Sequence, residues 1–272
     1  MKRLFVSISM FMLVIPALAL VISPPLSADP GDFPAERAAL MSLYDSTGGY
    51  SWYESEGWGG SNSYCTWYGV TCDSAGHVLH LDLQNNWLSG PIPPVIDNLV
   101  ALQTLDLSGN ILTGPLPEEL GNLAQLRLLD LSGNELCIKG CGRSLGGDIP
   151  ASLGKLANLQ TLDLSGNVLE GSIPAQLGNL AQLQTLDLSD NQFCRTEYLP
   201  PNDVTCSGGL LGTIPAELSG LSALQALSLH GNQALCWQTE AAKKWALTLP
   251  LYAGPTDCSY IPLVPSLRNL LP

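Results

Sequence analysis

The chain repeats one pattern, L-x-x-L-D-L-S-x-N-x-L-x-G, with a period of 24 residues. The clearest copies run from Leu102 to Gln125 and from Leu159 to Gln182. A fixed period of this length is typical of solenoids, in which each repeat packs only against its neighbours. The pattern therefore predicts one elongated domain whose function depends on its surfaces rather than on a buried reactive site.

Six repeats are predicted, and two of them are longer than the others. Successive first core positions are 24, 24, 33, 24 and 41 residues apart. The third and fifth repeats thus contain insertions of 9 and 17 residues, near 137–145 and 194–210. The first core positions are Val78, Leu102, Leu126, Leu159, Leu183 and Leu224.

Within each repeat, leucines alternate with polar residues at a period of two, which is typical of a strand with one buried face. The following P-x-x-L-G-N-L segment predicts a helix-like turn that returns along the convex side. One asparagine recurs in every repeat, and a buried amide can bond to the backbones of its own and adjacent repeats. We expect a structural ladder with no catalytic role, made of Asn86, Asn110, Asn134, Asn167, Asn191 and Asn232.

Residues 1–28 read as a secretion signal, with Lys2 and Arg3 ahead of an apolar stretch from Leu4 to Ile22 and small residues before Asp29. An uncleaved membrane anchor is the alternative, since the apolar stretch is long for a signal. The expected location is secreted or at the cell surface. The rest divides into an N-terminal cap at 29–76, repeats at 77–235, and a C-terminal cap and tail at 236–272.

Each end of a solenoid needs a cap to cover its open apolar core. At the N-terminal end we expect a helix over 33–46 and an aromatic cluster from Tyr50 to Tyr68, with a carbohydrate site as the alternative use of those rings. At the C-terminal end we expect a helix over 239–247, with Ala241, Trp245 and Leu247 facing inward.

The eight cysteines of an exported chain favour disulfides. Cysteines two repeats apart, such as Cys137 and Cys194, would be about 10 Å apart, beyond the reach of a disulfide. We therefore expect local closure, while a Cys194–Cys236 bond and metal ligation by four cysteines remain alternatives. The expected pairs are Cys65/Cys72, Cys137/Cys141, Cys194/Cys206 and Cys236/Cys258.

Charge and motifs exclude several classes of function. Only 13% of residues are charged and the net charge is −13, which argues against nucleic acid and anionic membrane surfaces as partners. The sequence contains no nucleophile elbow, zinc-protease motif or phosphate loop. We expect a protein that is not an enzyme and that has no cofactor or metal.

The G-x-I-P step, as in 171–174, resembles the plant-type leucine-rich repeats of receptor ectodomains and polygalacturonase-inhibitor-like proteins, over about residues 36–250. The stretches LYDSTGGYSWYESEGW and CTWYGVTCDSAGHVLHLDL resemble the cap of such repeats in bacterial, algal and oomycete secreted proteins. The resemblance implies an α/β fold, namely a right-handed curved solenoid with a concave parallel β-sheet, an extra lateral sheet and a binding function.

Candidate binding residues occur on the concave face and in the insertions. An aspartate recurs at one outward strand position, which suggests either an acidic stripe for a basic partner or cation, or simply the common residue of this repeat type. Otherwise the concave face is nearly uniform, and long loops on rigid scaffolds often carry recognition. The candidates are His80, Arg127 and His230 on the concave face, and Lys139, Arg143, Arg195, Glu197 and Tyr198 in the insertions.

We expect a binding protein for a protein or peptide ligand, which contacts it through the concave face and the inserted loops. A structural envelope or adhesion protein is the second hypothesis. An inhibitor of a hydrolase, suggested by the resemblance to polygalacturonase-inhibitor-like proteins, is the third. The sequence does not identify the ligand or the oligomeric state.

Overall fold

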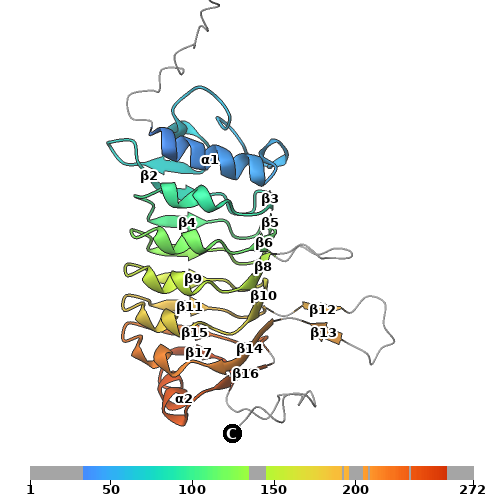
Figure 1. Ribbon diagram of the computed structural model, residues 1–272, viewed down its shortest axis with the longest axis vertical. Helices are drawn as coiled ribbons and strands as arrows, with labels where there is room; N and C mark the ends of the chain where they lie inside the picture. The colour runs from blue at the N-terminus through green and yellow to red at the C-terminus, as the bar shows by residue number, and fades with distance from the viewer. Residues whose placement is uncertain are drawn as a thin grey trace, which may run out of the picture.

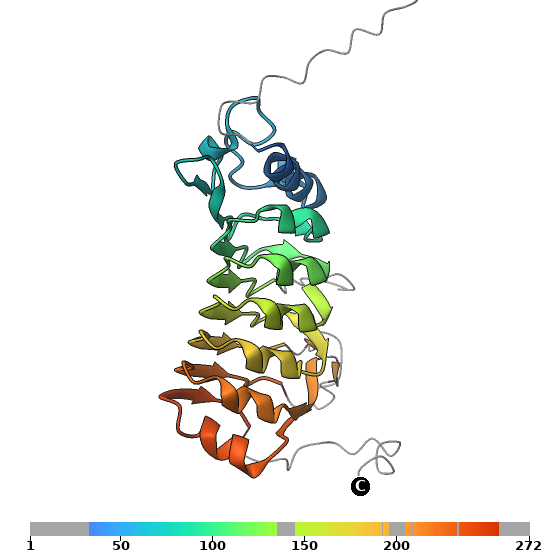
Figure 2. The same ribbon diagram turned by 60° about the vertical axis from the view of Figure 1, so that its left-hand side comes forward.

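The computed structural model describes residues 33–134, 145–191, 193–195, 205–207, 209–232 and 234–255. The predicted signal segment lies outside the described residues. The molecule is an elongated stack of coils with helix α1 (Pro34–Ser46) at one end and helix α2 (Glu240–Ala246) at the other (Figures 1 and 2). Within the described part of the chain, no helix is long and apolar enough to cross a membrane.

One edge of the stack is an eight-stranded sheet in the order β1-β2-β4-β7-β9-β11-β15-β17. Strand β1 is antiparallel to β2, and all other neighbours are parallel. The six repeats supply β2 to β15, and the two caps add one strand at each end, so the predicted repeat number is confirmed. The bounds are β1 Val70–Cys72, β2 Val78–Asp82, β4 Thr104–Asp106, β7 Leu128–Asp130, β9 Thr161–Asp163, β11 Thr185–Asp187, β15 Ala226–Ser228 and β17 Leu251–Ala253.

A second set of strands lies along another side of the coils (Figure 1). This is the lateral sheet that the family resemblance implies, and it runs in the order β16-β14-β10-β8-β6, with a separate parallel pair β3-β5. Five short 3₁₀ turns return the chain between repeats, where helix-like turns are predicted. The strands are β3 Ser89–Gly90, β5 Ile111–Leu112, β6 Gly114–Pro115, β8 Leu145–Asp148, β10 Val168–Gly171, β14 Gly209–Ile214 and β16 Ala234–Trp237, and the turns are η3 Pro94–Asn98, η4 Glu118–Asn122, η5 Ala151–Lys155, η6 Ala175–Asn179 and η7 Ala216–Gly220.

Leucines fill the space between the sheets, and all six predicted first core positions are buried. The ladder asparagines are buried beside them, and Asn167 shows how they work. Its amide donates to the carbonyls of Leu131 at 3.0 Å and Leu164 at 2.9 Å, and its oxygen accepts from the backbone N–H of Asn134 at 3.2 Å. From Asn110 on, each ladder asparagine joins two repeats in this way and satisfies backbone groups that would otherwise be unpaired in the core.

The N-terminal cap is built from large aromatic side chains and one buried carboxylate. Trp52, Trp58 and Trp67 are buried against one another, with ring centroids 4.9 to 5.0 Å apart. Glu36 of α1, only 2% exposed, accepts from the Val78 backbone N–H at 2.8 Å and lies 2.7 Å from the His77 ring. These contacts fasten α1 and the aromatic cluster to the first repeat.

The C-terminal helix is correctly predicted, but its buried face is not. The hydroxyl of Thr239 accepts from the backbone N–H of Ala242 at 3.1 Å and caps the helix. The helix therefore begins at Glu240, and its inward residues are Ala242 and Ala246. Trp245 is half-buried as expected, whereas Ala241 and Leu247 are exposed.

The disulfides are described in part. Cys65 and Cys72 are bonded and link the cap loop to β1. Cys194 and Cys206 oppose each other in the antiparallel pair β12 (Phe193–Arg195) and β13 (Thr205–Ser207), the backbone arrangement that local closure requires. Cys236 is disulfide-bonded. Its predicted partner Cys258 lies outside the described residues, as does the predicted pair of Cys137 and Cys141.

Candidate functional site

The concave sheet carries a row of aspartates in register. Asp82 pairs with Asp106 on the next strand, and the alignment continues through Asp130, Asp163 and Asp187. From the second repeat on, each carboxylate accepts from the serine two residues later. In Asp163, for example, one oxygen accepts from the Ser165 N–H at 2.9 Å and from its hydroxyl at 2.6 Å. The row therefore stabilises the strand ends while it keeps negative charge on the surface.

The charged form is disfavoured for two carboxylates of this row. Burial raises the pKa of Asp106 and of Asp163, and the carboxylates on both sides raise it further, against the lowering effect of the serine bonds. Among the residues that the structure describes, no group of three or more His, Cys, Asp or Glu side chains could hold a metal ion. The row keeps negative charge on the concave face, and such a surface attracts cationic groups.

The predicted concave residues do not gather in one place. His80 lies on β2, Arg127 immediately precedes β7, and His230 follows β15 by two residues. Strands β2 and β15 are five steps apart in the sheet, or about 24 Å. These three side chains are therefore separate features of one long face.

His80 lines an open hollow of about 740 Å³ at the N-terminal end of the concave face. Its other walls include Asp82, Gln84, Tyr68 and Thr104, so the hollow lies between the cap and the first two repeats. Tyr68 is 42% exposed there. The combination of an aromatic ring, a carboxylate and an imidazole suits a polar side chain of a peptide or protein.

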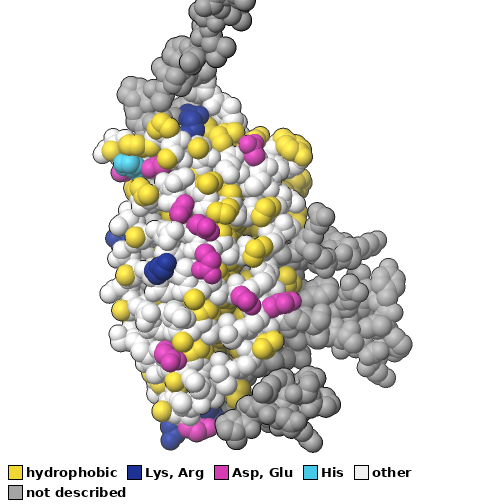
Figure 3. Space-filling view, viewed as in Figure 1, with side chains coloured by type: hydrophobic (Ala, Val, Ile, Leu, Met, Phe, Trp, Pro, Cys, Tyr) yellow, Lys and Arg dark blue, Asp and Glu magenta, His cyan; other side chains and the backbone are white. Residues whose placement is uncertain are grey.

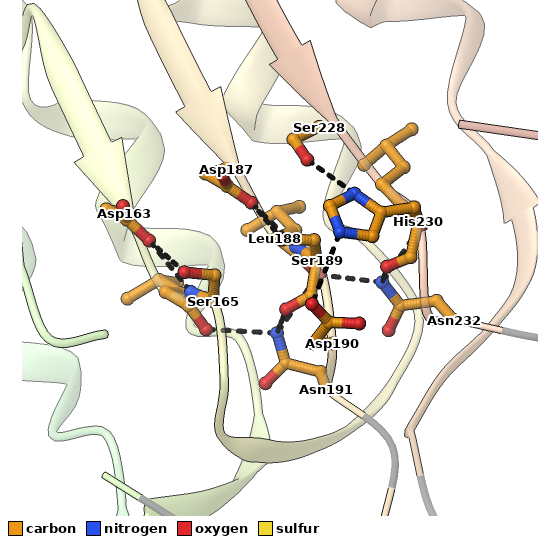
Figure 4. A network of polar contacts seen from close by, with 12 residues as sticks. Asp163, Ser165, Asp187, Leu188, Ser189, Asp190, Asn191, Ser228, His230 and Asn232 are labelled. Carbon is orange, nitrogen blue, oxygen red and sulfur yellow. Dashed lines mark hydrogen bonds and ion pairs between the residues drawn. The ribbon is translucent and has the colours of Figure 1, made fainter. Parts of the chain in front are cut away.

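His230 belongs to a polar network at the other end (Figure 4). Its Nδ1 lies 2.9 Å from the Ser228 hydroxyl, and its Nε2 lies 3.2 Å from a carboxylate oxygen of Asp190. A serine, a histidine and an aspartate in contact suggest a catalytic triad, but the His230 and Asp190 side chains are 56% and 61% exposed. Catalytic sites exclude water around such groups. The network is better explained as a link between the fifth and sixth repeats.

Asp190 has a backbone conformation that favours glycine, with φ of 52°. Four other repeats place a glycine with positive φ at this position: Gly109, Gly133, Gly166 and Gly231. An aspartate at this position costs some backbone energy. It also places a carboxylate against His230 directly before the second insertion.

The predicted residues of the insertions are only partly visible. Arg195 ends β12, whose backbone is described, and the β12–β13 hairpin extends outward from the side of the stack that carries β10 and β14 (Figure 1). The other four candidates lie outside the described residues: Lys139, Arg143, Glu197 and Tyr198.

One exposed aromatic pair, Tyr53 and Trp87, was not predicted from the sequence. The rings of Tyr53 and Trp87 have centroids 5.5 Å apart and an angle of 56° between their planes. Their exposed fractions are 67% and 59%, in contrast to the buried tryptophans of the cap. The sequence does contain a sign of it. Trp87 directly follows a ladder asparagine, and at the same position the second repeat has Ile111 and the fourth has Val168, which are smaller aliphatic residues.

A rigid frame and a strained backbone hold this pair. Asn86, 1% exposed, accepts from the Tyr53 N–H at 3.1 Å and the Glu54 N–H at 2.6 Å, and its amide donates to the Glu54 carbonyl at 2.8 Å. Trp87 itself has a φ of 61°, a region that bulky side chains rarely adopt. Such strain costs about 1–3 kcal/mol and is typical of functional positions.

The face shown in Figure 3 carries small, separate acidic and apolar patches. Where that face is described, neither kind of side chain forms one continuous patch.

Family models match most of the described chain. A model described as leucine rich repeat N-terminal domain matches residues 33–73. Two models described as leucine rich repeat match residues 144–193, and 77–99, 101–123 and 182–221. The matches cover the cap, the first, second, fourth and fifth repeats, and the end of the third.

Solved structures of Arabidopsis thaliana proteins are similar over most of this chain. A chain of the BIR3–SERK2 complex is 31% identical, with 81% of this chain and 97% of that chain covered and a TM-score of 0.56. The BIR2 ectodomain is 30% identical, with 75% and 95% covered and a TM-score of 0.57.

A third similar structure is PEPR1 bound to AtPEP1, which is 26% identical with a TM-score of 0.61. The match covers 81% of this chain but only 28% of PEPR1, so this chain spans less than a third of that longer solenoid. The repeats and the N-terminal cap agree with these comparisons. The chain belongs to the leucine-rich-repeat proteins, with plant-type repeats behind an N-terminal capping domain.

Proposed function

We propose that this protein is an extracellular recognition protein, secreted or held at the cell surface, that binds a protein or peptide ligand through its concave face and inserted loops. The observation that carries the proposal is the combination of a rigid, ladder-bonded solenoid with a hairpin that leaves it within the fifth repeat. A rigid scaffold loses little conformational entropy when it binds.

Similar solved structures support this proposal. They include PEPR1 with AtPEP1, BIR3 with SERK2, and HAESA in complex with the peptide hormone IDA and the co-receptor SERK1. HAESA is 26% identical to this chain with a TM-score of 0.50. A peptide or another solenoid is therefore the kind of ligand we propose. The acidic row and the net charge of −13 favour a ligand with basic side chains.

A structural role is the second candidate. It is favoured by the uniformity of the concave face, where the same aspartate–serine bond recurs in four repeats. Specific interfaces usually depend on a few distinct anchors. On this hypothesis the repeats act as a durable spacer in an envelope or adhesion layer.

The test is affinity capture from native surface extract with three baits. The first is the chain from Asp29, and the second has both insertions trimmed to the 24-residue repeat. The third keeps the insertions and carries Arg127→Glu, His80→Ala and His230→Ala on the concave face. Circular dichroism of all three baits checks that the solenoid is intact.

We expect a partner that the first bait holds and that at least one altered bait loses. Loss in the trimmed bait assigns recognition to the insertions, and loss in the third assigns it to the concave face. Capture of nothing by any folded bait would reject the proposal in favour of the structural role. Inhibition of polygalacturonase by the first bait would instead support the inhibitor hypothesis.

A further inference from the structure

We propose that Tyr53 and Trp87 form a binding site for a cationic side chain, an arginine or lysine of a peptide or protein, at the N-terminal edge of the solenoid. The two residues belong neither to the concave row nor to the inserted segments of the sequence. The site therefore stands or falls independently of the function proposed above.

Geometry gives the first argument. The two rings are 5.5 Å apart and meet at 56°, so they form an open wedge rather than a closed stack. Both are more than half exposed, although the cap next to them buries three tryptophans. Asn86 fixes the wedge from below through hydrogen bonds to the backbone of 53–54. A pair held this firmly in water offers two aromatic faces with little further loss of entropy.

Backbone strain gives the second argument. Trp87 has a positive φ of 61°, whereas the equivalent Ile111 and Val168 of other repeats do not. An ordinary repeat therefore does not need this conformation. The positive φ of Trp87 turns this large side chain toward solvent, so that burial of the ring does not offset the free-energy cost of the backbone strain. Strained, exposed tryptophans are better explained by recognition than by folding.

Charge identifies the ligand. No lysine or arginine occurs between residues 38 and 126, a segment that contains nine aspartates and glutamates. Glu54 follows Tyr53 directly and is exposed, and Glu56 lies two residues further on. Cations bind over the faces of tryptophan and tyrosine rings, and a nearby carboxylate strengthens that preference. A basic side chain matches both the wedge and its surroundings, whereas a neutral sugar would match only the rings.

The experiment uses the full chain from Asp29 with ¹⁵N-labelled tryptophan. The chain has six tryptophans, and the indole signal of Trp87 is identified by its absence in Trp87→Gly. The probe is a five-residue peptide with one central arginine between serine and glycine residues. A matched peptide carries citrulline, which has the same shape without charge. Cellohexaose serves as the neutral sugar.

We expect the arginine peptide to shift the Trp87 signal saturably in the millimolar range, and the citrulline peptide to bind roughly tenfold more weakly. Tyr53→Ser and Glu54→Gln should weaken binding, and Glu54→Gln should also reduce its dependence on salt. Tyr50→Ser is the matched control, since Tyr50 is 88% exposed on the same cap but makes no ring contact among the described residues.

Trp87→Gly should abolish binding without lowering the melting temperature, because glycine adopts positive φ freely. A lowered melting temperature with binding retained in Tyr53→Ser would assign the pair to folding and overturn the proposal. Equal binding of both peptides, no shift with either, or a shift with cellohexaose alone would overturn it as well. If Trp87→Gly fails to fold, the Tyr53 and Glu54 variants decide the question alone.

Discussion

The N-terminal cap and the repeat body are stabilised by different kinds of contact. The body repeats the same set of contacts, namely layers of leucines, an asparagine that joins two coils, and an aspartate bonded to serine. The cap uses contacts that occur once, including three packed tryptophans, a buried Glu36 and the Cys65–Cys72 disulfide.

This difference shows where individuality can arise. A change in one repeat position must still fit the neighbouring coils, which hold the same residues, so the body stays uniform. The cap has a coil on only one side, and its surface is free to differ. The exposed aromatic pair lies at the junction of the two regions, with Tyr53 from the cap and Trp87 from the first repeat.

The largest expected effect is a loss of stability in the repeat body. Asn167→Ala removes three amide-to-carbonyl bonds and leaves the Asn134 N–H without an acceptor, all in the core. We expect a loss of about 4 kcal/mol in the free energy of unfolding, measured in urea. Asn158→Ala is the control: this exposed asparagine bonds one carbonyl, and its loss should change stability by about 0.5 kcal/mol or less. Similar losses in both variants would show that the ladder contributes nothing special.

A smaller effect separates the cap from the body. Replacing Cys65 and Cys72 with serine opens a loop with a sequence separation of 7 and should cost the cap about 2.5 kcal/mol. Hydrogen exchange should show faster exchange in α1 and β2, and unchanged protection in β9 and β11. Faster exchange throughout would mean that cap and body unfold as one unit.

The smallest effect tests the acidic row and depends on pH. Burial raises the pKa of Asp106 and Asp163 above the ordinary value of 3.8. The native state therefore binds protons more tightly than the unfolded state, and the resulting stability is present below about pH 3.8 and is lost as pH rises through the raised pKa. Asp106→Asn with Asp163→Asn should stabilise the protein by about 0.5 kcal/mol at pH 7.

That gain should vanish near pH 3.5, as thermal unfolding at the two pH values would show. The amide of each variant retains an oxygen that accepts from its serine. Glu118→Gln, which neutralises an exposed carboxylate outside the row, is the control and should have no measurable effect. Destabilisation at pH 7 would mean that the charge strengthens the serine bonds by more than its burial costs.

Sequence reasoning recovered the fold because the same environment is encoded six times. The period of 24, the leucine alternation and the recurrent asparagine each report one geometry that stacking then repeats. The buried face of α2 was wrongly predicted, because the capping hydrogen bond to Thr239 sets where the helix begins and therefore which residues face inward. The Asp190–His230 contact was missed because the residues are brought together across a 17-residue insertion.

The exposed pair could not be predicted for a different reason. Tyr53 looked like one more member of an aromatic cap, and nothing in its neighbours separates it from the buried Trp52 beside it. The outward direction of Trp87 follows from a backbone angle that only the structure shows. The proposed cation site thus depends on residues that differ from the repeat pattern, and the pattern itself gives no information about such residues.

The insertions leave the coil just after the ladder asparagine and return at the lateral strands, at Leu145 of β8 and Gly209 of β14. Both ends of each loop are therefore anchored by parts of the repeat that the loop does not alter. Loop closure entropy grows slowly with length, so longer segments add little cost at such a position. In evolutionary terms, the junction is a position at which we expect loop segments to be exchanged without disturbing the leucine layers.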